Sequence, residues 1–220
     1  QVPAGEFSKI IAAAGGRDNA FTSKDYTAYF QQLQKSRLPL AFKLEADRMR
    51  NLRFTDEEFK KEIKVVMEER RWRTDDQPRA LLYERLLATA FLAHPYRAPV
   101  IGWMGDLQNM QPADARDWYR KWYAPNNASL VIVGDVRAED VFALARRHFG
   151  PIPPRTLPEP RPQQEPAQLG IRRITVRAPA QLPYLMMAYR VPSLQDPARD
   201  WEPYALEVLV GILDGSDAAR

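Results

Sequence analysis

A proline-rich segment constrains the fold of this chain more than any other feature of its sequence. Seven of the sixteen residues from Pro151 to Pro166 are proline, in PIPPRTLPEPRPQQEP. Proline lacks a backbone N–H and fixes its own φ, so this segment can be neither the interior of a helix nor a central strand. It is predicted to be an extended linker. We therefore expect a domain of residues 1–150, a linker of residues 151–168, and the start of a second domain in residues 169–220.

Caps and turns divide the chain into helices and a few strands. TDEE, from Thr55 to Glu58, is a capping box that opens a helix. Paired glycines after residue 14 end another helix. We predict helices over residues 3–14, 39–50, 56–72, 79–92, 113–123, 138–150 and 201–215, two strands within 19–33, and further strands over 128–136, 171–179 and 183–192. Helices in runs beside mixed strands favour an α+β fold.

Composition excludes several classes of protein. The absence of cysteine rules out disulfides and thiolate metal ligands. The net charge is +4, but basic and acidic residues are interleaved, so no nucleic-acid partner is expected. The longest apolar runs, such as SLVIVG, are the length of a strand, and we expect no transmembrane segment.

Two glutamates in EFKKEIKVVMEERRWRTDD share one face of the expected helix. Glu62 and Glu69 are seven residues apart, which puts them within about 20° of each other around the helix. One interpretation is that they border a core-facing apolar stripe and pair with arginines. The other is that they are desolvated carboxylates held by a cation or a proton. The spacing alone leaves both interpretations open.

Other candidate motifs are weaker. His94 and His148 are the only histidines, and neither has a second His or a Cys at metal-ligand spacing, so structural roles are predicted for both. The paired glycines lie in neither a GxGxxG nor a GK[ST] motif. No serine lies in a GxSxG turn, so serine-nucleophile chemistry is not expected.

Six segments in order resemble the pitrilysin/insulinase family of zinc metallopeptidases, the inverted zincins that include mitochondrial processing peptidase. They are GEFSKIIAAAGGRDNAFTSKDYTAYF, LEADRMRNLRF, FKKEIKVVMEERRWRTDDQP, HPYRAPVIGWMGDL, YRKWYAPNNASLVIVGDV and HFGPIP. The resemblance covers roughly Pro3 to Pro154. It implies a LuxS/mitochondrial-processing-peptidase-like metallohydrolase fold, α+β with helices packed on a mixed or antiparallel sheet, and a similar second domain after the linker.

The resemblance also assigns roles to residues. Glu69 matches the family's third zinc ligand and Glu62 its helper carboxylate, while Glu68 is the rival ligand if the motif is shifted by one residue. Asn19, Ala20 and Phe21 match the strand that pairs with an extended peptide substrate. Zinc is the cofactor implied, and the expected partners are a peptide and a second homologous half.

The chain departs from the family in having no HxxEH, the motif that supplies two zinc-binding histidines and the general base. We expect that motif to precede Gln1 in a longer zinc endopeptidase that uses a metal-activated water, with this fragment alone inactive. The alternative is a non-catalytic homologous half that shapes the chamber and binds substrate or partner. The sequence leaves the compartment open, although bacterial members of the family are often exported.

Overall fold

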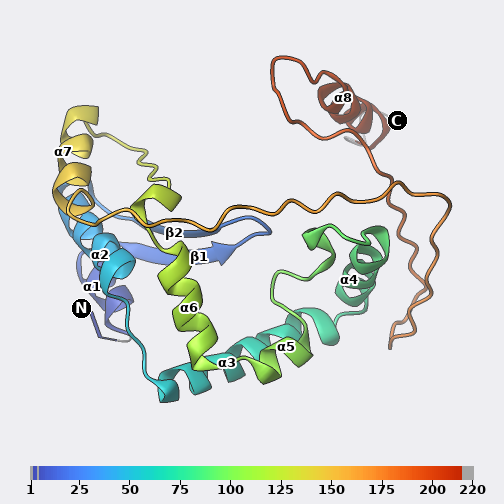
Figure 1. Ribbon diagram of the computed structural model, residues 1–220, viewed down its shortest axis with the longest axis horizontal. Helices are drawn as coiled ribbons and strands as arrows, with labels where there is room; N and C mark the ends of the chain where they lie inside the picture. The colour runs from blue at the N-terminus through green and yellow to red at the C-terminus, as the bar shows by residue number, and fades with distance from the viewer. Residues whose placement is uncertain (1, 4, 215–220) are drawn as a thin grey trace. The chain divides into compact units, whose positions relative to one another are not determined.

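The computed structural model describes residues 2, 3 and 5–214 and has an α+β fold (Figure 1). Two compact units are present, Gln1–Ala180 and Gln181–Arg220. The first unit therefore includes the proline-rich segment, and the division comes later than the predicted linker. No helix in the described part of the chain is long and apolar enough to cross a membrane.

The chain begins with a helix that leads into a hairpin. Helix α1 (Glu6–Ala13) ends where Gly15 adopts a φ of 77°, which favours glycine. A Cβ at Gly16 would lie 2.8 Å from a carbonyl oxygen of β2, so only glycine allows this close approach. Strands β1 (Arg17–Thr22) and β2 (Thr27–Gln32) then form an antiparallel pair. The predicted glycine stop and strand pair are confirmed.

Helices form most of the remaining structure, close to their predicted bounds. They are α2 (Leu38–Asn51), α3 (Asp56–Arg70), α4 (Pro78–Ala90), α5 (Met104–Asn109), α6 (Pro112–Trp122), α7 (Ala138–His148) and, in the second unit, α8 (Glu202–Asp214), with short helical turns at Lys35–Arg37, Pro95–Arg97 and Pro125–Asn127. The final turn expected of α3 is instead a π-helical segment, Arg71–Asp75. Gly215, the last residue of the expected final helix, lies outside the described residues.

Three predicted strands are wrong. Residues 128–136, 171–179 and 183–192 form no strand in the structure, and β1 and β2 make the only sheet among the described residues. A strand exists only when a neighbouring segment pairs with it, and no described segment pairs with these three. Their apolar side chains consequently stay in solvent: Val131 is 78% exposed and Val133 is 92% exposed.

The core of the first unit centres on α2. The buried apolar side chains of this unit are Ile11, Ala41, Phe42, Leu44, Ala46, Leu107 and Ala124. The ring of Phe42 lies 6.3 Å from that of His148 and 6.2 Å from that of Phe149, centroid to centroid. These ring contacts join α2 to the end of α7, and they give His148 the structural role expected from the sequence.

The proline-rich segment is extended and is fastened to the loop after α4. The carboxylate of Glu165 accepts hydrogen bonds from the backbone N–H groups of Leu92 (2.7 Å), Ala93 (2.8 Å) and His94 (2.7 Å). The guanidinium of Arg172 donates to the carbonyl oxygens of residues 89 and 90, at 2.9 and 2.8 Å. The Glu165 carboxylate thus binds backbone N–H groups, and the Arg172 guanidinium binds carbonyl groups at the end of α4. These two sets of contacts, which place opposite charges on opposite backbone dipoles, are called the clasp below.

Glu165→Ala is expected to release this clasp. Hydrogen bonds to a charged group contribute about 1.5–3 kcal/mol. The equilibrium constant for local opening of the segment should therefore increase roughly tenfold or more. Limited trypsin digestion, monitored at the bond between Arg173 and Ile174, measures that opening. The matched control is Glu159→Ala, which removes an exposed carboxylate from the same segment. Equal cleavage rates in the two variants would contradict the clasp.

Candidate functional site

Helix α3 carries both candidate carboxylates and begins at a capping box. The N–H of Glu58 donates to the hydroxyl of Thr55 (3.1 Å), and the N–H of Thr55 donates to the carboxylate of Glu58 (2.7 Å). These bonds to Thr55 lower the pKa of Glu58 below its usual value. Glu62 and Glu69 both lie within this continuous helix. Their Cα atoms are therefore about 10 Å apart along its axis and point within about 20° of each other.

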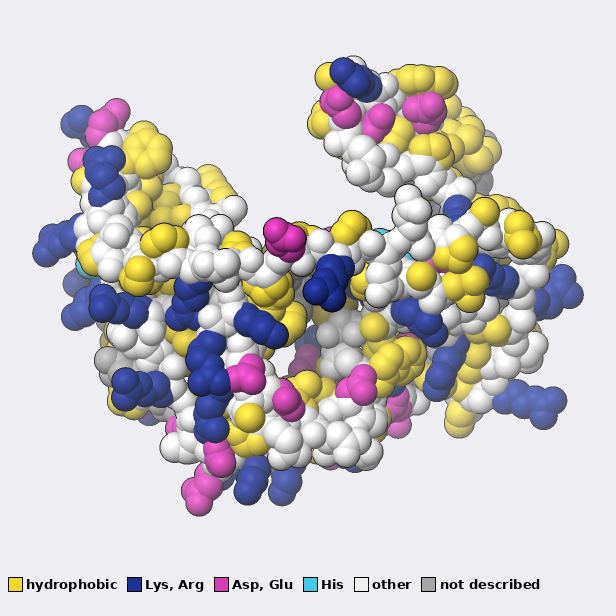
Figure 2. All heavy atoms as spheres, viewed as in Figure 1, with side chains coloured by type: hydrophobic (Ala, Val, Ile, Leu, Met, Phe, Trp, Pro, Cys, Tyr) yellow, Lys and Arg dark blue, Asp and Glu magenta, His cyan; other side chains and the backbone are white. Residues whose placement is uncertain are grey.

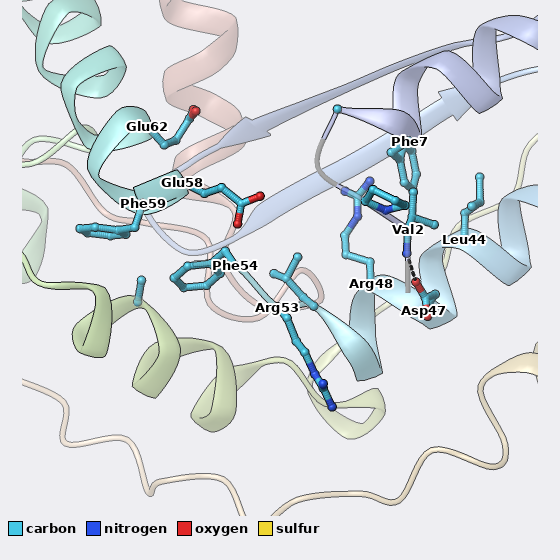
Figure 3. Close-up of a pocket in the computed structure, with 14 residues that line it drawn as sticks. Val2, Phe7, Leu44, Asp47, Arg48, Arg53, Phe54, Glu58, Phe59 and Glu62 are labelled. Carbon is cyan, nitrogen blue, oxygen red and sulfur yellow. Dashed lines mark hydrogen bonds between the residues drawn. The ribbon is translucent and has the colours of Figure 1, made fainter. Parts of the chain in front are cut away.

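Glu62 is exposed and borders a pocket of about 420 Å³ (Figure 3). In Figure 3, Glu58, Phe59 and Glu62 of α3 lie opposite Phe7 of α1 and Arg48 of α2. The full lining is Val2, Pro3, Gly5, Phe7, Leu44, Asp47, Arg48, Leu52, Arg53, Phe54, Glu58, Phe59, Glu62 and Ala115. The pocket is mainly apolar, and charged groups from α2 and α3 stand on its opposite sides.

Glu69 is less exposed than Glu68. Its side chain is 39% exposed and one oxygen lies 3.0 Å from Nη1 of Arg73, one turn further along the chain. The side chain of Glu68 is 70% exposed and forms an ion pair with Arg71. The first interpretation of the sequence, pairing with arginine, is therefore observed for Glu69. That pair is itself exposed, and such pairs are weak.

A buried ion pair directly follows Glu69. Arg70 is 3% exposed and Glu84 of α4 is 6% exposed. The guanidinium donates to both carboxylate oxygens of Glu84, at 2.8 and 3.1 Å, and to the carbonyl of Gly102 at 2.8 Å. Hydrogen bonding to Glu84 raises the pKa of Arg70 further above its usual value, so the guanidinium stays charged. Sequence reasoning missed this pair; the one available signal was a single acid in the apolar run ALLYERLL.

Strand β1 presents the three candidate substrate-binding residues. Asn19 lies opposite Phe30, Ala20 opposite Tyr29, and Phe21 opposite Ala28 across the hairpin. All three candidates are exposed. Because β2 is the sole described partner of β1, the second edge of β1 carries no strand in the part of the chain that the structure covers. That edge is geometrically available to an added strand.

The turn of the hairpin is anchored at its tip. The ammonium of Lys24 donates to the carbonyl oxygens of Tyr96 (2.9 Å) and Ala98 (2.5 Å), and Asp25 accepts a hydrogen bond from the hydroxyl of Tyr96. These contacts hold β1 and β2 against the loop after α4. They restrict the movement of the strand that carries Asn19, Ala20 and Phe21.

The described residues contain no complete set of zinc ligands. Within them, no three His, Cys, Asp or Glu side chains gather as metal ligands would. His94 is occupied locally: its Nδ1 accepts from the N–H of Tyr96 at 3.2 Å and its ring packs on Phe91. A zinc site involving Glu69 would thus need donors from outside these residues, and no chemical step through zinc follows from this chain alone.

Comparison with known proteins places this arrangement in a family. The family description "Insulinase (Peptidase family M16)" matches residues 1–102, and "Peptidase M16 inactive domain" matches residues 109–220. Zinc protease PqqE of Helicobacter pylori is 38% identical over 196 residues, which are 87% of this chain and 44% of that protein. An uncharacterized zinc protease of Mycobacterium leprae, ML0855, is 32% identical over 98% of this chain and 48% of its own length.

A solved structure shows the same fold. The crystal structure of a protease from Helicobacter pylori matches with a TM-score of 0.72 and 40% identity, covering 76% of this chain and 40% of that one. The two curated relatives are zinc proteases by name and the solved structure is that of a protease, so the class is that of a metallopeptidase-type α+β domain. The chain belongs to peptidase family M16. It spans less than half the length of the curated relatives described above.

Proposed function

We propose that this chain is part of the catalytic half of a longer zinc-dependent endopeptidase that hydrolyses extended peptides. The observation that carries the proposal is the pair of carboxylates, Glu62 and Glu69, on one face of α3 in a chain of family M16. A non-catalytic copy has no chemical reason to keep both of them.

The proposed roles follow from the position of each side chain. Glu69, the less exposed of the adjacent acids, would bind zinc together with ligands from outside the described residues. Glu62 would orient a neighbouring ligand, as supporting carboxylates do. Zinc with three protein ligands lowers the pKa of bound water to about 7. The residues of this chain would therefore bind the zinc ion and orient a neighbouring ligand. The general base is expected outside the described residues.

The proposed substrate is a peptide in an extended conformation. The free edge of β1 supports this proposal, because backbone N–H and C=O groups at an edge can pair with any extended segment. Asn19, Ala20 and Phe21 would contribute mainly backbone hydrogen bonds, which bind many sequences. A second homologous half, in the same chain or in another subunit, would complete the chamber.

A second candidate is a non-catalytic half that shapes the chamber for an active one. The description of residues 109–220 as an inactive peptidase domain favours it. On the face shown in Figure 2, dark blue Lys and Arg side chains stand among magenta Asp and Glu side chains.

Cleavage of an unstructured peptide by the whole protein distinguishes the two candidates. We expect cleavage to stop when zinc is removed by a chelator and to return when zinc is restored. Glu69→Gln should lower kcat/KM by about a thousandfold, or roughly 4 kcal/mol in transition-state free energy. Glu62→Gln should lower it by about 10–100-fold. Glu57→Gln, an exposed acid in the first turn of α3, is the matched control. Zinc-dependent cleavage that Glu69→Gln leaves unchanged would favour the non-catalytic half, and activity that survives complete zinc removal would exclude zinc-dependent catalysis.

A further inference from the structure

The position of Glu69 is not set by its own side-chain contacts. Its ion-pair partner among the described residues, Arg73, is 65% exposed and lies in the π-helical segment that follows α3. Exposed pairs of this kind contribute little and do not restrict a backbone. Whatever holds Glu69 in place must therefore act on the helix itself.

The next residue provides that restraint. Arg70 points about 100° away from Glu69 around the helix, so one faces the interior while the other faces solvent. Its guanidinium makes a two-pronged contact with Glu84, a third hydrogen bond to the Gly102 carbonyl, and lies 3.3 Å from a carboxylate oxygen of Asp75. A planar guanidinium with several fixed acceptors permits one orientation only.

The contacts of Arg70 reach three separate parts of the chain. Glu84 belongs to α4, Gly102 to the loop before α5, and Asp75 to the π-helical segment. The guanidinium also lies 5.9 Å from the ring centroid of Trp103. The end of α3 is thus fixed where regular helical hydrogen bonding changes to the π pattern, a place where helices otherwise distort.

Stability alone is a poor explanation of this pair. Nε of Arg70 is buried and has no hydrogen-bond partner among the residues that the structure describes, which carries a cost in stability. Apolar side chains of similar size are often as stabilising as a buried ion pair. We propose that the Arg70–Glu84 pair is a positioning device that holds the backbone at Glu69 in the orientation needed to bind zinc. This inference rests on the proposed function of Glu69.

The test compares zinc affinity with stability in the whole protein, by chelator competition and by urea unfolding. Glu84→Gln should weaken zinc binding about 10–100-fold, the usual effect of losing a supporting group. In the double variant Arg70→Met with Glu84→Leu, the unfolding midpoint should return toward that of the unaltered protein. Zinc affinity should stay low in that variant, because the link to Gly102 and Asp75 is absent.

Three results would overturn the inference. The first is that Glu84→Gln folds and binds zinc normally. The second is that the double variant recovers zinc affinity together with stability. The third is that neither variant folds. Glu6→Gln, which disrupts the exposed Lys9–Glu6 pair, is the control and should change zinc affinity less than about twofold. If Glu69→Gln itself leaves zinc affinity unchanged, the proposed function fails first. If it weakens binding while Glu84→Gln does not, only the positioning role is wrong.

Discussion

Glu84→Ala is expected to lower the free energy of unfolding by about 3–5 kcal/mol, because it leaves the charge of Arg70 buried without its main partner. Arg70 is nearly inaccessible to water, so solvent cannot replace the two hydrogen bonds that are lost. Asp75 and the Gly102 carbonyl remain, and they compensate only part of the charge. Urea unfolding followed by far-ultraviolet circular dichroism measures the change.

Glu6→Ala is the matched control for this experiment. The ion pair of Glu6 with Lys9 is exposed on α1, and its loss should cost less than about 1 kcal/mol. Similar losses for the two variants would mean that Arg70 reaches solvent, contrary to the burial described above.

Phe42→Ala is expected to lower the free energy of unfolding by about 3–5 kcal/mol through cavity formation. Phe42 is 2% exposed, and its ring packs against those of His148 and Phe149 at the end of α7. Removing the ring leaves α2 and α7 without their aromatic contact. The same urea experiment measures the effect, with tryptophan fluorescence as a second probe.

Phe142→Ala makes the same chemical change at an exposed position of α7. That side chain is 59% exposed, so the expected change is within about 0.5 kcal/mol. If Phe42→Ala were equally mild, α7 would not pack on α2 as described.

Local signals predicted the helices and the hairpin well. The capping box at Thr55 and the glycine stop at Gly15 are determined by residues within four positions of each other, so the sequence shows them directly. The strand predicted over residues 128–136, in contrast, is absent from the structure. It has the right composition, but a strand also needs a partner, and no local pattern reveals one.

The part of the candidate site that depends on local spacing was predictable, and the part that depends on tertiary contacts was not. A seven-residue spacing places Glu62 and Glu69 on one helix face without any tertiary information. The contact between Arg70 and Glu84 spans fourteen residues and joins two helices, and the clasp of Glu165 on residues 92–94 spans more than seventy. Such contacts depend on how helices and loops pack together. The sequence shows that a residue is charged, but it does not show which distant residue it contacts.

Zinc titration of the whole protein tests the central claim most directly, with Glu69→Gln and Glu68→Gln compared side by side. The two variants make the same change at adjacent positions of α3, about 100° apart around the helix. We predict that Glu69→Gln weakens zinc binding at least about 100-fold, while Glu68→Gln changes it less than about threefold. Equal effects, or a larger effect at Glu68, would contradict the central claim.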